Sequence, residues 1–175
     1  MDVPRDGLVG RLLGRASGRS VPDAVGAVLL DRGERRLAWA LTDAGRPVLA
    51  TDVGLRLPDG GRWAWPDVER VSWRRPTLLV VRVSESEGSG PRVQLELERE
   101  EGLADVVRSQ VTASIAWSDH VRLAPAGGVR VVGRRRPGQD LLDWQLVFDA
   151  GTDPSDPLLR AQADEVVERA RRTIG

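Results

Sequence analysis

The chain has a single histidine, His120, which directly follows Ser118 and Asp119. Serine, histidine and aspartate are the residue types of a hydrolytic triad, in which the histidine takes the proton of the serine hydroxyl and the carboxylate orients the histidine. Neighbouring residues cannot supply that geometry, because it normally joins separate segments of a chain. The sequence also contains no Gly-x-Ser-x-Gly turn, which exposes the nucleophile in many such enzymes. We therefore predict no catalytic residue and expect His120 at a helix end or a strand entry.

Three aspartates, Asp149, Asp153 and Asp156, offer oxygen ligands to a hard cation. Their spacing fits no calcium-binding loop, and each aspartate suits a turn or a helix cap. The chain lacks cysteine, which excludes disulfides, thiolate metal sites and cysteine nucleophiles. Its glycines do not follow a phosphate-binding spacing. We therefore expect no metal ion and no cofactor.

Two runs of arginine are the remaining residues that could bind a ligand. Three arginines follow Gly133 and two follow Trp73. Guanidinium groups bind phosphate and an indole ring can stack on a base, so such runs are also found in nucleic-acid binders. However, 26 basic residues balance 26 acidic ones, and this favours solvated turns over a nucleic-acid site. The two runs, with the tryptophan beside one of them, form the candidate interaction surface: Trp73, Arg74, Arg75, Arg134, Arg135 and Arg136.

Composition limits the architecture and the cell compartment. With 175 residues, of which 41% are hydrophobic, the chain suits one compact unit with extensions. All its basic residues other than His120 are arginine, and Lys, Asn and Tyr are absent, which is typical of a high-GC, actinobacterial source. The start of the chain resembles neither a signal peptide nor a transmembrane segment, so we expect a cytoplasmic protein.

Residues 1–23 are expected to form an N-terminal segment. Within Gly7–Arg19, leucine and valine recur at helical spacing with arginines on the opposite side, which is typical of a helix that lies on a membrane surface. The alternative is a tail that docks on its own domain or frays, since four glycines lower the helix propensity of this stretch. Pro22–Leu30 predicts a short second helix.

Residues 24–117 show the period of a β-sheet followed by a helix. Turn residues such as Asp43–Arg46 and Pro58–Gly61 separate short alternating stretches. Trp63 and Trp65 are expected in the core or at its edge, since the chain has one Phe and no Tyr to fill it. The helix is predicted over Glu100–Trp117. The expected strands lie at Arg35–Leu41, Pro47–Ala50, Leu55–Leu57, Trp63–Trp65, Val68–Trp73, Thr77–Val83 and Arg92–Glu98.

Residues 118–175 are expected to add strands and a helix that pack on this sheet. Val129–Val132 and Leu141–Phe148 are predicted to form a hairpin, with His120–Leu123 as a further strand. Asp156 followed by Pro157 is a typical helix start, and the apolar face continues to Ile174. The expected fold class is therefore α+β.

Gly33–Trp73 resembles bacterial pleckstrin-homology-like domains, and more closely a family of uncharacterised actinobacterial proteins. The shared cues are Gly33-Glu34 before the first strand, the step from Thr51-Asp52 to Leu55, and Trp65-x-x-Val68. The resemblance implies a bent antiparallel sheet or partly open barrel of about seven strands, capped by a helix. The family's pattern commonly has two basic residues after the Thr-Asp pair, whereas this chain has Val53-Gly54, so no anion site is implied.

Together these observations favour a non-enzymatic binding or scaffold module that recognises another protein. Association with a membrane surface through the N-terminal segment is the alternative, and an enzyme of unrecognised type is the third hypothesis. Nucleic acid is not an expected partner.

Overall fold

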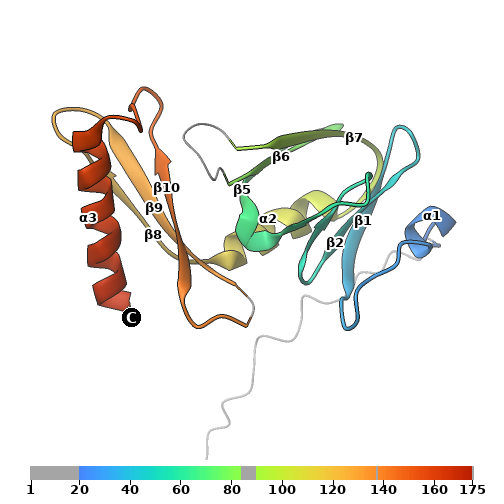
Figure 1. Cartoon of the computed structure of the whole chain (residues 1–175). Helices are drawn as coiled ribbons and strands as arrows, with labels where there is room; N and C mark the ends of the chain where they lie inside the picture. The colour runs from blue at the N-terminus through green and yellow to red at the C-terminus, as the bar shows by residue number, and fades with distance from the viewer. Residues whose placement is uncertain (1–19, 84–89, 137, 175) are drawn as a thin grey trace, which may run out of the picture.

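The computed structural model describes residues 20–83, 90–136 and 138–174, which form two lobes (Figure 1). The barrel lobe contains the first seven strands and α2 (Leu103–Ser114), and the C-terminal lobe contains three strands and α3 (Pro157–Ile174). The amphipathic helix expected within Gly7–Arg19 lies outside the described residues.

The barrel lobe is a curled antiparallel sheet with the strand order β4-β3-β2-β1-β7-β6-β5. The predicted α+β class and the curled seven-stranded sheet with a helix after it are confirmed. β7 and β1 are neighbours although far apart in sequence, so the two halves of the sheet join there. The strands are β1 (Arg36–Thr42), β2 (Pro47–Thr51), β3 (Gly54–Arg56), β4 (Arg62–Ala64), β5 (Val68–Arg74), β6 (Thr77–Arg82) and β7 (Arg92–Glu101).

The core of the barrel lobe lies between the concave face of the sheet and α2. On β1, the small side chains of Ala38 and Ala40 face this core, and α2 contributes Leu103 and Val107. Strand alternation therefore sends Trp39 to the opposite face. There it packs with Leu49 and with residues around α1 (Asp23–Gly26), which covers the outside of the sheet.

The tryptophans expected in the core are found there or at its edge. Trp65 is buried and its indole N–H donates to the carbonyl of Thr51 at 2.9 Å, while Trp63 packs half-buried against the same core. Trp65 does not continue the strand as predicted. It begins a short 3₁₀ helix, η1 (Trp65–Asp67), because Pro66 cannot donate to a sheet ladder.

α2 is shorter than predicted at both ends. β7 continues to Glu101, and Gly102 takes the left-handed conformation (φ 70°) that turns the chain into the helix. The glutamates expected in the first helical turn precede it instead, and Glu100 accepts a hydrogen bond from the backbone N–H of Ala104. At the far end, Ile115 directly begins β8, so the predicted boundary at 117/118 lies inside a strand.

The C-terminal lobe is a three-stranded antiparallel sheet in the order β10-β9-β8, with α3 on one face. Its strands are β8 (Ile115–Arg122), β9 (Gly128–Arg135) and β10 (Leu142–Phe148). In Figure 1, α3 lies on the side of this sheet away from the barrel lobe. On the α3 face, the rings of Trp117 and Trp144 make an edge contact with centroids 5.3 Å apart, and both tryptophans pair with Gly133.

A carboxylate cluster ties the segment before β1 to the edge of the barrel sheet. The buried side chain of Glu34 accepts hydrogen bonds from Arg56, at 3.0 Å for Arg56 Nε to Glu34 Oε1, and Asp31 bridges Arg56 to Arg62. These guanidinium bonds lower the pKa of Glu34 from 4.5 to about 2.

We predict that Glu34→Gln destabilises the protein near neutral pH and that the difference from wild type disappears in acid. The pKa of Glu34 is lower in the folded state, so its contribution is complete above pH 4.5 and is lost as pH falls towards about 2. Urea unfolding at a series of pH values measures the difference. A difference that stays constant down to pH 2 would contradict this assignment.

Candidate interaction surface

Arg134 lies between the two lobes, not on the surface. Its side chain projects from β9 away from α3, and the residue is 2% exposed. The guanidinium donates to Ser114 Oγ at 2.6 Å, to the Glu69 carbonyl at 3.1 Å and to Gln145 Oε1 at 2.9 Å. It also reaches the Val111 carbonyl in the last turn of α2, where a positive charge suits the helix dipole.

Arg136 joins the same two lobes through charge. It donates to Asp67 of η1 at 2.7 Å and to Asp143 of β10. Burial opposes its charged form, but the bonds to Asp143 and Asp67 prevail and raise the pKa of Arg136. Gln145 completes the contact by donating to the Pro66 carbonyl at 3.1 Å. We call Arg134, Arg136 and Gln145 the latch.

The latch corrects the predicted interaction surface, because Arg134 is buried and unavailable to a partner. The hairpin predicted from Val129–Val132 and Leu141–Phe148 leaves the three arginines in its connecting loop, whereas β9 continues to Arg135, which pairs with Leu142. Within the strand, alternation turns Arg134 inward and leaves Arg135 exposed.

The other predicted positions remain at or near the surface. Arg74 and Arg75 are exposed at the turn between β5 and β6, and Arg75 approaches Glu100 at 4.0 Å. Trp73, which was predicted on the interaction surface, packs half-buried against the barrel core. The structure does not bring the two arginine runs together into one surface, since Arg134 and Arg136 contact Glu69 and Asp67 at the start of β5, whereas Arg74 and Arg75 lie at its other end.

A second polar surface lies on the C-terminal lobe, on the sheet face opposite α3. The latch covers one end of that face, and strand alternation brings polar side chains together at the other end. His120 pairs directly with Arg130, and Arg130 pairs with Val147, so the three form one row across the sheet. The open face, as we call it, comprises His120, Arg122, Arg130, Val147 and Asp149.

His120 and Asp149 form an ion pair when the imidazole is protonated, at 2.9 Å between Nε2 and Oδ2, and both side chains are 44% exposed. The pair lies directly over Gly128. A Cβ atom at Gly128 would stand 2.2 Å from Asp149 Oδ2 and 3.0 Å from His120 Nε2, so only glycine leaves room for the contact. The neighbouring backbone is held by Thr152, whose Oγ1 accepts from the Gly128 N–H at 3.1 Å.

Asp119, the residue before His120, does not orient the imidazole. Its Oδ1 accepts a hydrogen bond from the backbone N–H of His120 instead, in agreement with the expectation that neighbouring residues cannot form a triad. Ser118 lies two residues from His120 in the same strand, on the same face. Residues so spaced are about 6.6 Å apart, beyond the roughly 3 Å that a serine-to-histidine proton transfer requires. The arrangement fixes the imidazole without giving it a nucleophile from Ser118.

The aspartates considered as cation ligands serve separate structural roles. Asp153 accepts from the side chain and backbone of Ser155, bonds that lower its pKa, and Asp156 accepts from the Leu158 N–H at 2.8 Å at the start of α3. Within the described residues, no three His, Asp or Glu side chains are grouped as metal ligands would be.

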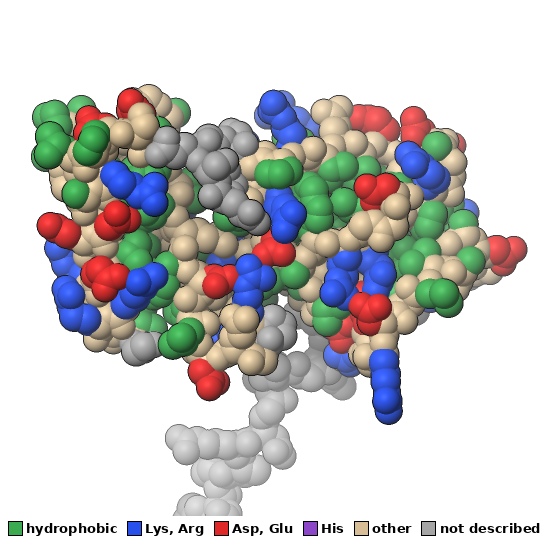
Figure 2. Space-filling view, in the orientation of Figure 1, with side chains coloured by type: hydrophobic (Ala, Val, Ile, Leu, Met, Phe, Trp, Pro, Cys, Tyr) green, Lys and Arg blue, Asp and Glu red, His purple; other side chains and the backbone are tan. Residues whose placement is uncertain are grey.

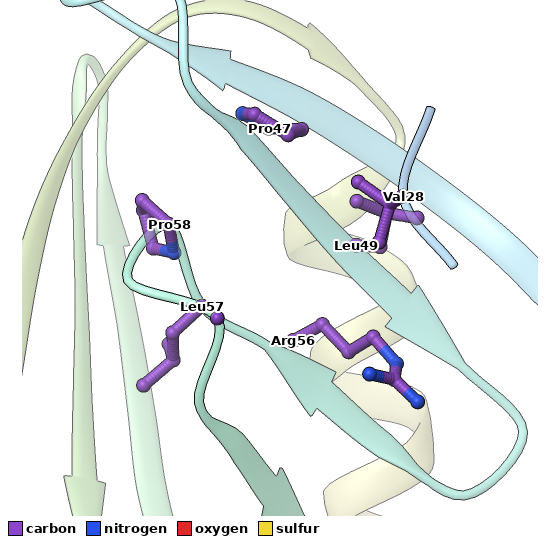
Figure 3. A pocket seen from close by; sticks show the side chains of 7 residues that line it. Val28, Pro47, Leu49, Arg56, Leu57 and Pro58 are labelled. Atoms are coloured by element: carbon purple, nitrogen blue, oxygen red, sulfur yellow. The ribbon is translucent and has the colours of Figure 1, made fainter. Parts of the chain in front are cut away.

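A small pocket of about 120 Å³ opens on the outer side of the barrel sheet (Figure 3). This is well below the roughly 300 Å³ at which small-molecule sites begin. Figure 3 shows the Arg56 side chain beside it, and that guanidinium is already engaged by Glu34. The pocket is lined by Val28, Pro47, Leu49, Arg56, Leu57, Pro58 and Gly60.

Surface charge is mixed on both lobes. Figure 2 shows acidic and basic side chains interspersed, with no broad region of one sign on the visible face. Among the described helices, none is both long and apolar enough to cross a membrane.

Comparison with known proteins gives no relative: no family profile, no curated protein and no solved structure matches the chain.

The sequence did not identify the open face, and it assigned Arg134 and Arg136 to an interaction surface, whereas they join the two lobes in the latch. Because His120 and Arg122 are two residues apart in β8, they lie on the same face of the sheet. This spacing could have indicated the open face from the sequence. No local signal identified Gln145, because its partner Pro66 is 79 residues away.

We predict that Arg134→Ala lowers the free energy of unfolding by about 3 kcal/mol, because buried acceptors in both lobes lose their donor. The neighbouring Arg135→Ala, at an exposed position, serves as the matched control and should change stability by less than about 0.5 kcal/mol. Urea unfolding measures both variants. Equal, small losses would show that Arg134 does not hold the lobes together.

We predict that Gly128→Ala separates His120 from Asp149, because the new methyl group displaces one of these side chains, and that it lowers stability by no more than about 1 kcal/mol, since an exposed ion pair is lost. Gly26→Ala is the control, since a Cβ there meets no heavy atom within 4 Å. Thermal unfolding measures stability, and the proton NMR signals of the single histidine report its displacement. Unchanged histidine signals in Gly128→Ala would contradict the described contact.

Proposed function

We propose that this chain is a non-enzymatic protein-binding module and that the open face is its binding surface. The observation that supports the proposal is the row of His120, Arg130 and Val147, which stands on paired strands and is covered by neither α3 nor the latch. The backbone of paired strands is ordered before a partner arrives, which reduces the entropy lost on binding.

The charge of the open face indicates the kind of partner. Arg122 and Arg130 are exposed, and neither has a described ion-pair partner. The single carboxylate of the face, Asp149, is occupied by His120. The surface therefore suits a protein that presents carboxylates, because complementary charge raises the association rate and selects the partner.

We also propose that the barrel lobe is pleckstrin-homology-like. The meander order of its strands and the helix that follows β7 support this. That fold serves protein binding, lipid binding and scaffolding, so the fold by itself does not select the function. Membrane association through Gly7–Arg19 depends on residues outside the described part and stays an alternative, as does an unrecognised enzyme.

A photo-crosslinking amino acid at Arg122 or at Arg130 tests the proposal in cells of the source organism. We expect both positions to form an adduct with the same protein, identified by mass spectrometry. A crosslinker at Arg169, an exposed arginine of α3, is the matched control and should not form that adduct. Adding Arg122→Glu to the Arg130 crosslinker chain should abolish the adduct, since a carboxylate partner is repelled.

Two results would contradict the proposal. One is the absence of any protein adduct at both open-face positions. The other is the same adduct at equal yield from Arg169, which would indicate nonspecific contact.

A further inference from the structure

The open face brings three side chains that can carry positive charge close together. His120 and Arg122 are two residues apart in β8, so they share a face, and Arg130 of β9 pairs directly with His120. Residues opposite one another in an antiparallel pair begin about 5 Å apart, and residues two apart in a strand begin about 6.6 Å apart. All three side chains are exposed, so their nitrogen atoms are within reach of one small anion above the sheet.

The two arginines of this face are not engaged by carboxylates. Within the described residues, neither Arg122 nor Arg130 has an ion-pair partner. In the barrel lobe, by contrast, the guanidinium of Arg56 is taken up by Glu34. A guanidinium without a carboxylate partner keeps its fork of N–H donors for a ligand. Both arginines of the open face therefore offer their donors to an anion.

Asp149 fixes the imidazole of His120. Its two oxygens contact Nε2 at 2.9 and 3.1 Å, and in the part of the chain that the structure describes no hydrogen bond engages Nδ1. Gly128 leaves the space for this carboxylate, since a Cβ there would stand 2.2 Å from Asp149 Oδ2. A protonated imidazole carries an N–H at each nitrogen, so Asp149 holds the ring through one and leaves the other for a ligand.

The charge of the open face suits an anion with more than one negative charge. With the imidazole protonated, three positive charges stand beside the single negative charge of Asp149. A carboxylate has one charge and two oxygens, which a single guanidinium satisfies in a bidentate pair. A phosphate monoester has about −1.5 to −2 charges near neutral pH and three strong acceptor oxygens. Three donor groups with an excess of two positive charges therefore match a phosphate more completely than one carboxylate.

We propose that the open face binds a phosphorylated side chain of its protein partner, which rests on the proposed function because it names the group that the same surface recognises. Arg122, Arg130 and His120 donate to the phosphate oxygens. Asp149 is a positioning residue, since its carboxylate holds the imidazole and repels the anion. Clusters of arginine are a recurring means of recognising phosphorylated segments of proteins.

The orientation of the open face favours a protein over a lipid headgroup. In Figure 1, α3 lies on the side of the sheet away from the barrel lobe, so the opposite face is turned towards that lobe. A flat bilayer approaching this face would also meet the barrel lobe, whereas a protein presents its phosphate on a single narrow side chain. The large apolar side chains that are exposed among the described residues, such as Leu29, Leu141 and Leu158, do not belong to this face.

Two small probes test the preference for phosphate in the full chain: N-acetyl-O-phosphoserine amide and N-acetyl-glutamate amide. NMR shifts of the backbone amides of β8 and β9 measure both dissociation constants. We expect the constant of the phosphoserine probe to be about tenfold lower, because it accepts at least one more charge-assisted hydrogen bond. Equal constants, or no shift with the phosphoserine probe, would overturn the phosphate site.

Arg130→Gln should raise the dissociation constant of the phosphoserine probe about tenfold, because the site loses one guanidinium. Arg122→Gln makes the same test from β8. Arg135→Gln is the matched control, since it replaces an exposed arginine of β9 on the other face and should leave the constant unchanged. Thermal unfolding shows whether the variants are folded. Binding that is equally strong in all three variants would show that these arginines do not hold the phosphate.

Vesicles distinguish a phosphorylated protein from a phosphorylated lipid. We expect the wild-type chain and Arg130→Gln to float equally with phosphatidylcholine vesicles that contain phosphatidylinositol phosphate. Flotation that Arg130→Gln removes would overturn the choice of a protein.

The crosslinked partner provides the last test, because its peptide at Arg122 or Arg130 should carry a phosphorylated residue by mass spectrometry. An unphosphorylated adduct, together with equal binding of the two probes, would overturn the phosphate and leave the proposed protein binding intact. The absence of an adduct, together with a preference for phosphoserine, would overturn the proposed function and leave the phosphate site.

Discussion

The position of the C-terminal lobe relative to the barrel lobe depends on the buried guanidinium group of Arg134. Arg134 carries a positive charge into a contact that holds no carboxylate hydrogen-bonded to it, and the acceptors around it are carbonyls, a hydroxyl and an amide. Burial lowers the pKa of Arg134 from its ordinary value, and the nearby charge of Glu69 opposes that effect. Such a group is tolerated only where its donors find acceptors, so α2, β5 and β10 must stay where they are.

Much of the fold could be predicted because its signals are local. Turns rich in glycine and proline separate the strands of the barrel lobe, and the alternation of residues such as Val93, Leu95 and Leu97 indicates a half-buried strand. Asp156 and Pro157 correctly indicated the start of α3. The end of α2 was harder, because Ile115 and Trp117 fit an apolar helix face as well as a strand.

The functional surface was less predictable, because it depends on which way a strand faces. Arg134, Arg135 and Arg136 look alike in sequence, yet a single register decides that Arg134 is buried, Arg135 exposed and Arg136 paired with Asp67. A shift of one residue would reverse the first two. On the other face, Gly133 leaves room for its neighbours, since a Cβ there would stand 3.0 Å from Leu142 and 3.2 Å from the Trp144 ring.

The direct passage from Ser114 of α2 to Ile115 of β8 has a mechanical consequence. Most domains in one chain are joined by a flexible linker, and their relative rotation is the default expectation. Here no residue separates helix from strand, and the same junction is held by the Ser114 hydroxyl and the latch. Rotation of the C-terminal sheet relative to the barrel lobe would therefore require α2 to bend at its last turn or the bonds of the latch to break.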